Sequence, residues 1–165
     1  MNRTAKGTTP TEVTLGDIAE SIVDGPFGSN LKTSEYVDVG VPVLQGKNIT
    51  GNKFVWADIR YITEEKAEQL KRSSIVAGDH LLIKIGSIGY SAIVDDLHGH
   101  DFAIIPANLA RLRPNRSIID DRYLHRVLTS DVISRHFQSV ASKTAQPALS
   151  LKKIKETPVP LPPLP

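Results

Sequence analysis

The sequence contains no cysteine. Disulfide bonds, thiolate metal sites and thiol nucleophiles are therefore excluded together, and the absence suits the reducing environment of the cytosol. The first ten residues include Arg3 and Lys6 but lack the apolar segment of a secretion signal. No run elsewhere approaches the roughly 18 apolar residues of a membrane-spanning helix. We therefore expect a cytoplasmic protein.

Aromatic residues are scarce at 5% of the chain, with a single tryptophan. The core must therefore rest mainly on isoleucine, leucine and valine, which favours β-sheet. A length of 165 residues, with 40% hydrophobic and 23% charged residues, suits one soluble globular domain. The formal net charge of +2 permits a polyanionic partner but is smaller than that of many nucleic-acid binders. Charge alone therefore does not decide the function.

The polar and apolar pattern predicts an α/β (α+β) domain with a twisted mixed β-sheet, flanking helices and a face built from loops. The clearest strand is 80–85, with 90–94 as its hairpin partner. Two amphipathic stretches, 120–129 and 130–141, predict helices that face the core. Other strands are expected at 42–45, 54–57, 61–62, 103–105 and 108–112, and short capped helices at 14–20, after Thr63, and at 150–155.

The two ends of the chain differ in composition from the middle. Residues 1–11 are polar and threonine-rich, which predicts a flexible leader. Residues 158–165 are rich in proline, which predicts an extended, polyproline-like segment. The folded domain is therefore expected over 12–157.

Four predicted loops gather small and polar residues: 25–32, 45–48 and 84–89, which contain glycine, and 142–147, which does not. Lysine, serine and backbone N–H groups suit phosphate, whereas glutamine and asparagine can bond an adenine edge and lysine can reach guanine. Each loop alone is more typical of an ordinary turn with solvated polar residues. The residues by themselves predict ligand-binding loops and leave the ligand open.

Seven short motifs follow one another along the chain: Leu15–Asp17, Gly25–Ser29 with Leu31-Lys32, Gly40–Leu44 with Asn48-Ile49, Gly78-Asp79, Lys84–Gly89, Ala145–Pro147 with Leu149–Leu151, and Pro158–Pro163. In order and spacing they resemble the target-recognition domains of type I restriction-modification specificity subunits. The resemblance covers roughly Glu12 to Pro165. Each motif is weakly specific, so the evidence is their joint occurrence.

The resemblance implies a non-catalytic chain that reads one half of a bipartite double-stranded DNA target. It implies two partners, a modification (methylase) subunit and a restriction subunit. S-adenosylmethionine is then expected in the modification subunit, with no cofactor and no metal in this chain. The proline-rich end matches the family's exit into a long spacer helix, so we expect a truncated piece of a longer subunit or a natural half-subunit.

Transferred onto this sequence, the resemblance predicts a set of DNA-binding residues: Ser29, Asn30, Lys32, Gln45, Lys47, Asn48, Lys84, Ser87, Lys143, Thr144 and Gln146. Gly28 and Gly86 either contact DNA or only shape their loops. Four arginines are weaker candidates for phosphate contacts, since exposed arginine is usually solvated surface: Arg60, Arg72, Arg111 and Arg113.

The sequence does not favour either of two enzyme classes. Asp58 with Glu64-Glu65-Lys66 superficially resembles the acidic pattern of metal-dependent nucleases, but the latter three residues are expected to begin a helix, where acids complement the dipole. A methyltransferase would need a glycine-rich cofactor loop, which the sequence lacks. His98-Gly-His100-Asp101 is interpreted as a polar turn more readily than as a metal site.

A protein-interaction module is the remaining alternative. In this interpretation the proline-rich segment 158–165 docks to a partner. The basic cluster Lys152, Lys153 and Lys155 just before it is either a solvated helix face or a phosphate contact. Deleting 158–165 would abolish partner binding under this hypothesis, whereas the DNA hypothesis places the essential residues in the loops.

Overall fold

A four-stranded antiparallel sheet lies at the centre of the molecule. The computed structural model describes residues 10–26 and 30–162. The sheet has the strand order β2 (Ala19–Asp24), β11 (Leu109–Pro114), β8 (His80–Ile83) and β9 (Ser91–Ile93). All three neighbouring pairs are antiparallel. β8 and β9 are consecutive strands that form the expected hairpin.

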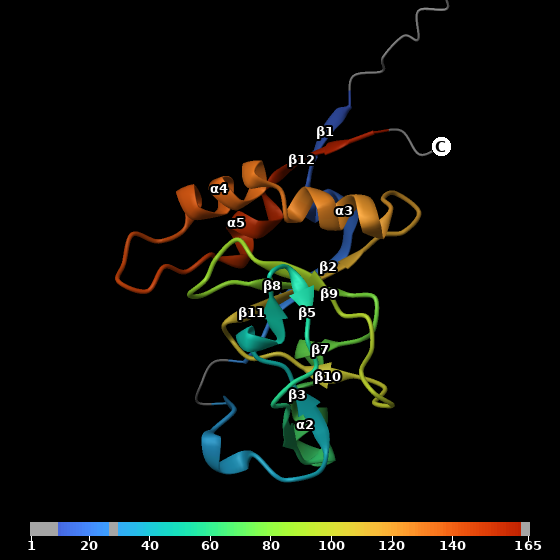
Figure 1. Ribbon diagram of the computed structural model, residues 1–165, viewed down its shortest axis with the longest axis vertical. Coiled ribbons are helices and arrows are strands. Elements are labelled where there is room, and N and C mark those ends of the chain that lie inside the picture. Colours follow the sequence, from blue (N-terminus) through green and yellow to red (C-terminus); the bar gives the residue numbers. More distant parts are fainter. Residues whose placement is uncertain (1–9, 27–29, 163–165) are drawn as a thin grey trace, which may run out of the picture.

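A second four-stranded sheet forms the opposite end from the long helices (Figure 1). Its order is β6 (Arg60–Ile62), β3 (Val41–Val43), β10 (Ala103–Ile104) and β7 (Ser74–Ile75). β3 and β10 are parallel and the other pairs antiparallel, so this sheet is the mixed one. The short helix α2 (Glu64–Gln69) follows β6 of this sheet. Its N-cap Thr63 accepts a hydrogen bond from the backbone N–H of Lys66.

Four helices lie beside the central sheet: α1 (Leu15–Ile18), α3 (Asp121–Leu128), α4 (Asp131–Val140) and α5 (Leu151–Lys155). Each follows an N-cap whose side-chain oxygen accepts a backbone N–H from the first turn, which satisfies a donor that has no partner within the helix. These caps are Thr14, Asp120, Ser130 and Ser150. No helix in the described part of the chain is long and apolar enough to cross a membrane.

Two small pairings complete the fold. β1 (Thr11–Thr14) and β12 (Pro158–Leu161) are antiparallel, so the two ends of the described chain lie side by side (Figure 1). β4 (Ile49–Thr50) and β5 (Lys53–Phe54) form a hairpin. Its turn is Gly51-Asn52, both with positive φ, as tight hairpin turns require. Short 3₁₀ turns occur at Thr33–Glu35, Gly46–Asn48 and Lys71–Ser73.

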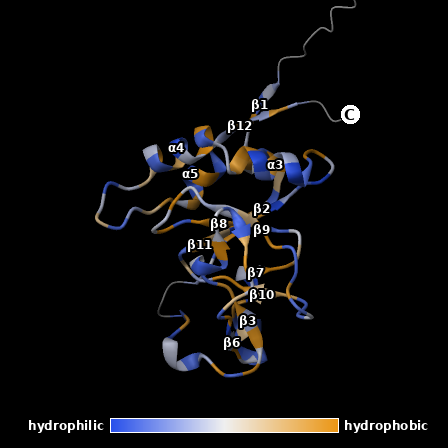
Figure 2. Ribbon diagram, viewed as in Figure 1, coloured by the Kyte–Doolittle hydropathy of each residue, from blue (hydrophilic) through white to orange (hydrophobic). Residues whose placement is uncertain are grey.

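The central sheet is buried on both faces, and β8 shows this directly. Leu82 packs with Leu124 and Phe137 in the cluster beneath the helices. Its neighbours Leu81 and Ile83 pack in a second cluster, on the side of the mixed sheet. Successive side chains of a strand point to opposite faces, so alternation along β8 divides its residues between two cores. Figure 2 shows that the hydrophobic segments are concentrated in this interior and that many loops at the edge of the molecule are hydrophilic.

The predicted fold class is confirmed, and the following local expectations need correction. The helix expected at 14–20 is shorter. Helix α1 ends after one turn at Ile18, and residues 19–24 form strand β2. The proline-rich segment is not a free polyproline helix, since Pro158–Leu161 pairs with β1 and Val159 is buried.

Candidate nucleic-acid interface

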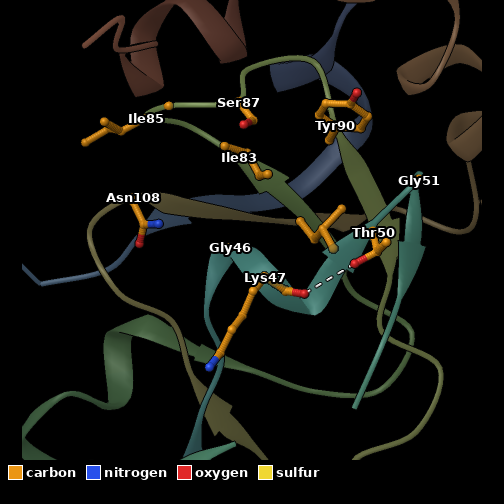
Figure 3. Close-up of a pocket in the computed structure, with 11 residues that line it drawn as sticks. Gly46, Lys47, Thr50, Gly51, Ile83, Ile85, Ser87, Tyr90 and Asn108 are labelled. Atoms are coloured by element: carbon orange, nitrogen blue, oxygen red, sulfur yellow. Dashed lines mark hydrogen bonds between the residues drawn. The ribbon is translucent and has the colours of Figure 1, made fainter. Parts of the chain in front are cut away.

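Three separate segments meet at one surface pocket of about 540 Å³, called the loop pocket below. They are the turn and hairpin 46–51, the end of β8 with the following loop 83–90, and the residue just before β11, Asn108. The residues that line the pocket are Gly46, Lys47, Ile49, Thr50, Gly51, Ile83, Ile85, Gly86, Ser87, Tyr90 and Asn108 (Figure 3). Two of the four predicted loops are therefore neighbours in space.

Asn48 holds the first of these segments in place. Its side chain is fully buried. Its Oδ1 accepts the backbone N–H of Gln45 at 2.8 Å, and its Nδ2 donates to the carbonyls of Val55 and Ala57, both at 2.9 Å. Both N–H groups of the amide are thus used inside the protein. The placement of Asn48 supports a structural role and gives no support to its predicted contact with DNA.

The neighbouring Lys47 is exposed and extends from the edge of the pocket (Figure 3). Its Nζ lies 3.7 Å from Asp58, in an ion pair that solvent screens on both sides. Gln45 is half-buried, and its Nε2 atom has no hydrogen-bond partner among the described residues. Because this atom is itself buried, the structure gives no support to the predicted contact of the Gln45 amide nitrogen with DNA.

The loop 84–89 is fixed by main-chain bonds on both sides. The carbonyl of Asn108 accepts the N–H groups of Lys84 and Ile85, at 2.8 and 3.2 Å. On the other side, Gly86 N donates to the Pro147 carbonyl at 3.2 Å, and Leu149 N donates to the Lys84 carbonyl at 2.7 Å. Gly86 has φ 95°, which favours glycine. Gly86 is therefore assigned a loop-shaping role, and Ser87 beside it is exposed.

These bonds bring the fourth predicted loop, 142–147, next to 84–89 on the same side of the molecule (Figure 1). The 142–147 loop is closed at its base, where Ser142 N and Ala148 O are 2.9 Å apart and Ala148 N donates to Ser142 Oγ. The Thr144 hydroxyl donates to the Gln146 carbonyl at 2.8 Å. Lys143, Thr144 and Gln146 are all exposed.

The first predicted loop, 25–32, is described only in part. A Cβ on Gly25 would lie 2.2 Å from the Ile105 carbonyl oxygen, so only glycine permits this approach to the segment before Asn108. Asn30 and Lys32 are exposed, and the backbone N–H of Lys32 donates to Glu35 at 2.7 Å. Ser29 and Gly28 lie outside the described residues, so the predictions for them stay predictions.

Lys84 does not present a free charge. Its Nζ lies 2.7 Å from Asp24 Oδ2, and both side chains are mostly buried, at 12% and 16% exposure. Arg72 approaches the other carboxylate oxygen of Asp24 at 3.4 Å. Asp24 therefore joins the end of β2 to the start of the 84–89 loop. The placement of Lys84 supports this internal role and not the predicted DNA contact.

Two of the four arginine candidates also serve the interior. Arg111 is buried and donates to the Ser74 carbonyl and to Ser21 Oγ, both at 2.7 Å, and burial lowers its pKa. Arg113 forms two 2.8 Å hydrogen bonds with the buried Asp79, which raise its pKa. By contrast Arg60 is exposed, with its guanidinium 5.1 Å from the ring centroid of Tyr36.

Asn108 and Tyr90 line the loop pocket, although the sequence pattern did not mark them as site residues. The pattern placed both residues in predicted strands, 108–112 and 90–94. The available sequence feature was Pro106-Ala107-Asn108, a turn-forming tripeptide between two apolar runs. Its importance follows from contacts with residues 84 and 85, which a local pattern does not reveal.

The features behind the alternative interpretations have other local explanations. His98 and His100 stack against Trp56, with ring centroids at 4.8 and 6.0 Å. Within residues 10–26 and 30–162, no group of three or more metal-ligating side chains was found. Glu64 and Glu65 occupy the first turn of α2, where they complement the helix dipole.

Comparison with protein families identifies one that spans almost the whole chain. Residues 9–165 match the model of the type I restriction modification DNA specificity domain. A putative specificity subunit of the type I restriction enzyme MjaX from Methanocaldococcus jannaschii is 28% identical over 154 residues, which are 91% of this chain and 35% of that protein. The specificity subunit of the type I restriction enzyme EcoBI from Escherichia coli is 30% identical over 124 residues, or 74% of this chain and 25% of that protein.

Solved structures share the fold. The HsdS subunit from Thermoanaerobacter tengcongensis superposes with a TM-score of 0.66 at 22% identity, over 98% of this chain and 36% of that one. A chain from a study of assembly and conformational transition in the type I restriction-modification system gives a TM-score of 0.68 at 20% identity, over 99% of this chain and 37% of that one. The chain thus spans about a quarter to a third of the curated relatives and just over a third of these structures.

Proposed function

Because the chain belongs to the family of type I restriction modification DNA specificity domains, we propose that its loops read one half of a bipartite double-stranded DNA target. The family is one of recognition domains, and its named relatives are specificity subunits, so the chain is not itself the enzyme.

One observation carries the proposal: exposed polar side chains and internally used ones are interleaved in the same loops. Lys47, Ser87 and Lys143 project from three loops that main-chain bonds or the shared pocket bring together. Asn48 is next to Lys47 in the sequence, and Lys84 is in the same loop as Ser87. Both bond these loops to the interior of the protein. Loops carried on a rigid scaffold are the usual place for binding residues.

We assign two roles to the exposed residues. Cations, hydroxyl groups and one amide at the edge contact phosphates, which position the protein without reading sequence. These residues are Asn30, Lys32, Lys47, Ser87, Lys143 and Thr144. The exposed Gln146 can offer both a donor and an acceptor to an adenine edge. Gln45 stays in the proposed set from the sequence alone, because its Nε2 atom is buried. Ser29 stays in the proposed set from the sequence alone.

The proposed partners are a modification subunit, which binds S-adenosylmethionine and methylates adenine, and a restriction subunit that cleaves. The support is the nature of the relatives, which are specificity subunits of type I restriction enzymes. The chain spans only part of those proteins, which fits a module that reads one half-site while another part of the full subunit reads the second.

Docking through a free proline-rich tail is not favoured. Pro158–Leu161 pairs with β1 residue by residue, from Thr14 with Pro158 to Thr11 with Leu161. The Tyr123 hydroxyl also donates to the Pro160 carbonyl at 2.7 Å. A partner that binds this segment as an isolated polyproline helix would have to separate it from the domain.

Selection from a pool of randomised duplex DNA at low salt tests the proposal. The wild-type chain is expected to retain duplexes that share one short motif. The double variant Lys143→Ala, Gln146→Ala should lose that enrichment, whereas Arg122→Ala, an exposed cation on α3, should keep it. Retention of DNA without any enriched motif, by the wild-type chain, would contradict sequence reading.

A further inference from the structure

The loop pocket combines an apolar floor with a polar edge. Ile49 and Ile83, each only 7% exposed, supply the apolar part. Asn108, Ser87 and Lys47 supply an amide, a hydroxyl and an ammonium group around it. The volume of about 540 Å³ lies within the range of sites that bind small ligands, so the pocket has room for the edge of one heterocyclic base.

Asn108 is a polar residue of this pocket whose backbone is held by two hydrogen bonds. Its carbonyl accepts two N–H groups from the 84–89 loop, so its main chain is fixed relative to that loop. Its amide lies between Ile85 and Gly46 at the pocket (Figure 3). A Cβ on Gly46 would lie 3.4 Å from the Asn108 Nδ2 atom, so Gly46 and the amide are neighbours at the pocket.

The amide of Asn108 is available to a ligand. Among the described residues it makes no side-chain hydrogen bond, in contrast to the amide of Asn48, whose N–H groups both have partners. Asn108 is half-buried and lines the loop pocket, so part of its side chain remains accessible. A fixed main chain and an unused amide are the features of a group prepared for recognition.

The chemistry of the pocket selects one base pair. An amide presents a donor and an acceptor side by side, which match N7 and the N6 amino group of adenine in the major groove. Guanine presents two acceptors at that edge, and cytosine a single donor. The paired thymine carries a methyl group, which suits an apolar surface such as Ile49 and Ile83.

We propose that the loop pocket reads an A·T pair of the DNA target, with the Asn108 amide bonded to the adenine edge and the isoleucine floor facing the thymine methyl group. Lys47 extends outward from the pocket edge, where the phosphate backbone would pass (Figure 3). The inference rests on the proposed DNA-reading function and makes Asn108 a specificity-determining residue.

The test compares the motif selected from randomised duplexes by the wild-type chain with that selected by two variants. Asn108→Ala should lose the preference for A·T at one position and keep every other position. Asn108→Asp, which can only accept, should shift that position toward cytosine. Arg122→Ala should select the wild-type motif. An A·T preference that survives both substitutions, or a loss at all positions by a folded variant, would overturn the assignment.

A second measurement leaves the protein unchanged. Replacing the assigned adenine by 7-deazaadenine removes the N7 acceptor, and wild-type affinity should fall by about tenfold. The Asn108→Ala variant should show no such fall, because it no longer uses N7. An equal fall in both proteins would place the contact elsewhere. If the wild-type chain enriches no motif, the proposed function fails, whereas an enriched motif without a sensitive A·T position refutes only this inference.

Discussion

The helical end of the molecule and its loop end use polar residues in different ways. At the helical end, the polar side chains at the starts of α3, α4 and α5 cap helices, and the apolar faces meet one core. At the loop end, polar residues close in sequence divide into two groups. Asn48 and Lys84 are used inside the protein, whereas Lys47 and Ser87 are exposed. Polarity in a loop therefore does not by itself identify a binding residue.

The largest effect expected is in the core of the helical end, and it should leave sequence reading intact. Phe137 is 3% exposed, so Phe137→Ala should lower the free energy of unfolding by about 3–5 kcal/mol. Val132 on the same helix is 75% exposed, and Val132→Ala should change it by less than about 0.5 kcal/mol. Urea unfolding measures both. A folded Phe137→Ala chain that selected a different DNA motif would break the division between the two ends.

The buried His80, which lies between the two ends, should make stability depend on pH. Burial lowers its pKa from 6.5 to about 4, opposed by its contact with Asp121 at 3.4 Å. Between pH 6.5 and 4 the unfolded chain therefore binds a proton at His80 more readily than the folded chain does. The contribution of His80 to the free energy of unfolding is fully present above pH 6.5 and is lost as the pH falls toward 4. The loss attributable to His80 is about 3 kcal/mol.

Urea unfolding at pH 7.5 and 4.5 tests this dependence. His80→Phe should show a smaller difference between the two pH values than the wild-type chain. Asp17→Asn is a second variant. It removes the exposed carboxylate of the helix α1 cap, whose own pKa is lowered by hydrogen bonding with Thr14. Equal pH dependence in the wild-type chain and His80→Phe would contradict the assignment.

Asn48 and Lys47 sharpen the contrast within the loop end. Asn48→Ala should cost about 1–3 kcal/mol of stability, because it leaves the carbonyls of Val55 and Ala57 without a donor. Lys47→Ala should not change thermal stability. It should instead reduce the slope of log affinity against log salt by about 0.9, the value for one phosphate contact. Calorimetry measures the change in stability, and a salt titration of duplex binding measures the change in slope. A stability loss in Lys47→Ala with a reduced salt slope in Asn48→Ala would refute the division between exposed and internal residues.

The mostly buried carboxylate of Asp24 should affect mainly non-specific binding. Asp24→Asn should release Lys84 and Arg72 from their counter-charge and strengthen binding to unrelated duplexes at low salt. The salt slope should steepen by at most about two units, one for each cation that gains a phosphate. Asp58→Asn is the control, since the pair of Lys47 and Asp58 is exposed and already screened. An unchanged slope for Asp24→Asn would mean that these cations lie away from the DNA.

The helical end was largely predictable from the sequence, and the loop end only in part. Caps and amphipathic faces are local patterns, so 120–129 and 130–141 gave α3 and α4 to within a few residues. The burial of Lys84 depends on Asp24, which lies 60 residues away. The role of Asn108 depends on bonds to 84 and 85. Contacts between distant loops are set by the packed sheets that carry them, and no local pattern shows them.

The most direct test of the account is to follow the backbone amide signals of the whole chain by nuclear magnetic resonance while its selected duplex is added. The account predicts shifts in the segments 30–32, 45–51, 84–90 and 142–147 and at Asn108, with little change in α3 or in the β1–β12 pair. Shifts confined to α3 and the β1–β12 pair, with the loops unchanged, would contradict it.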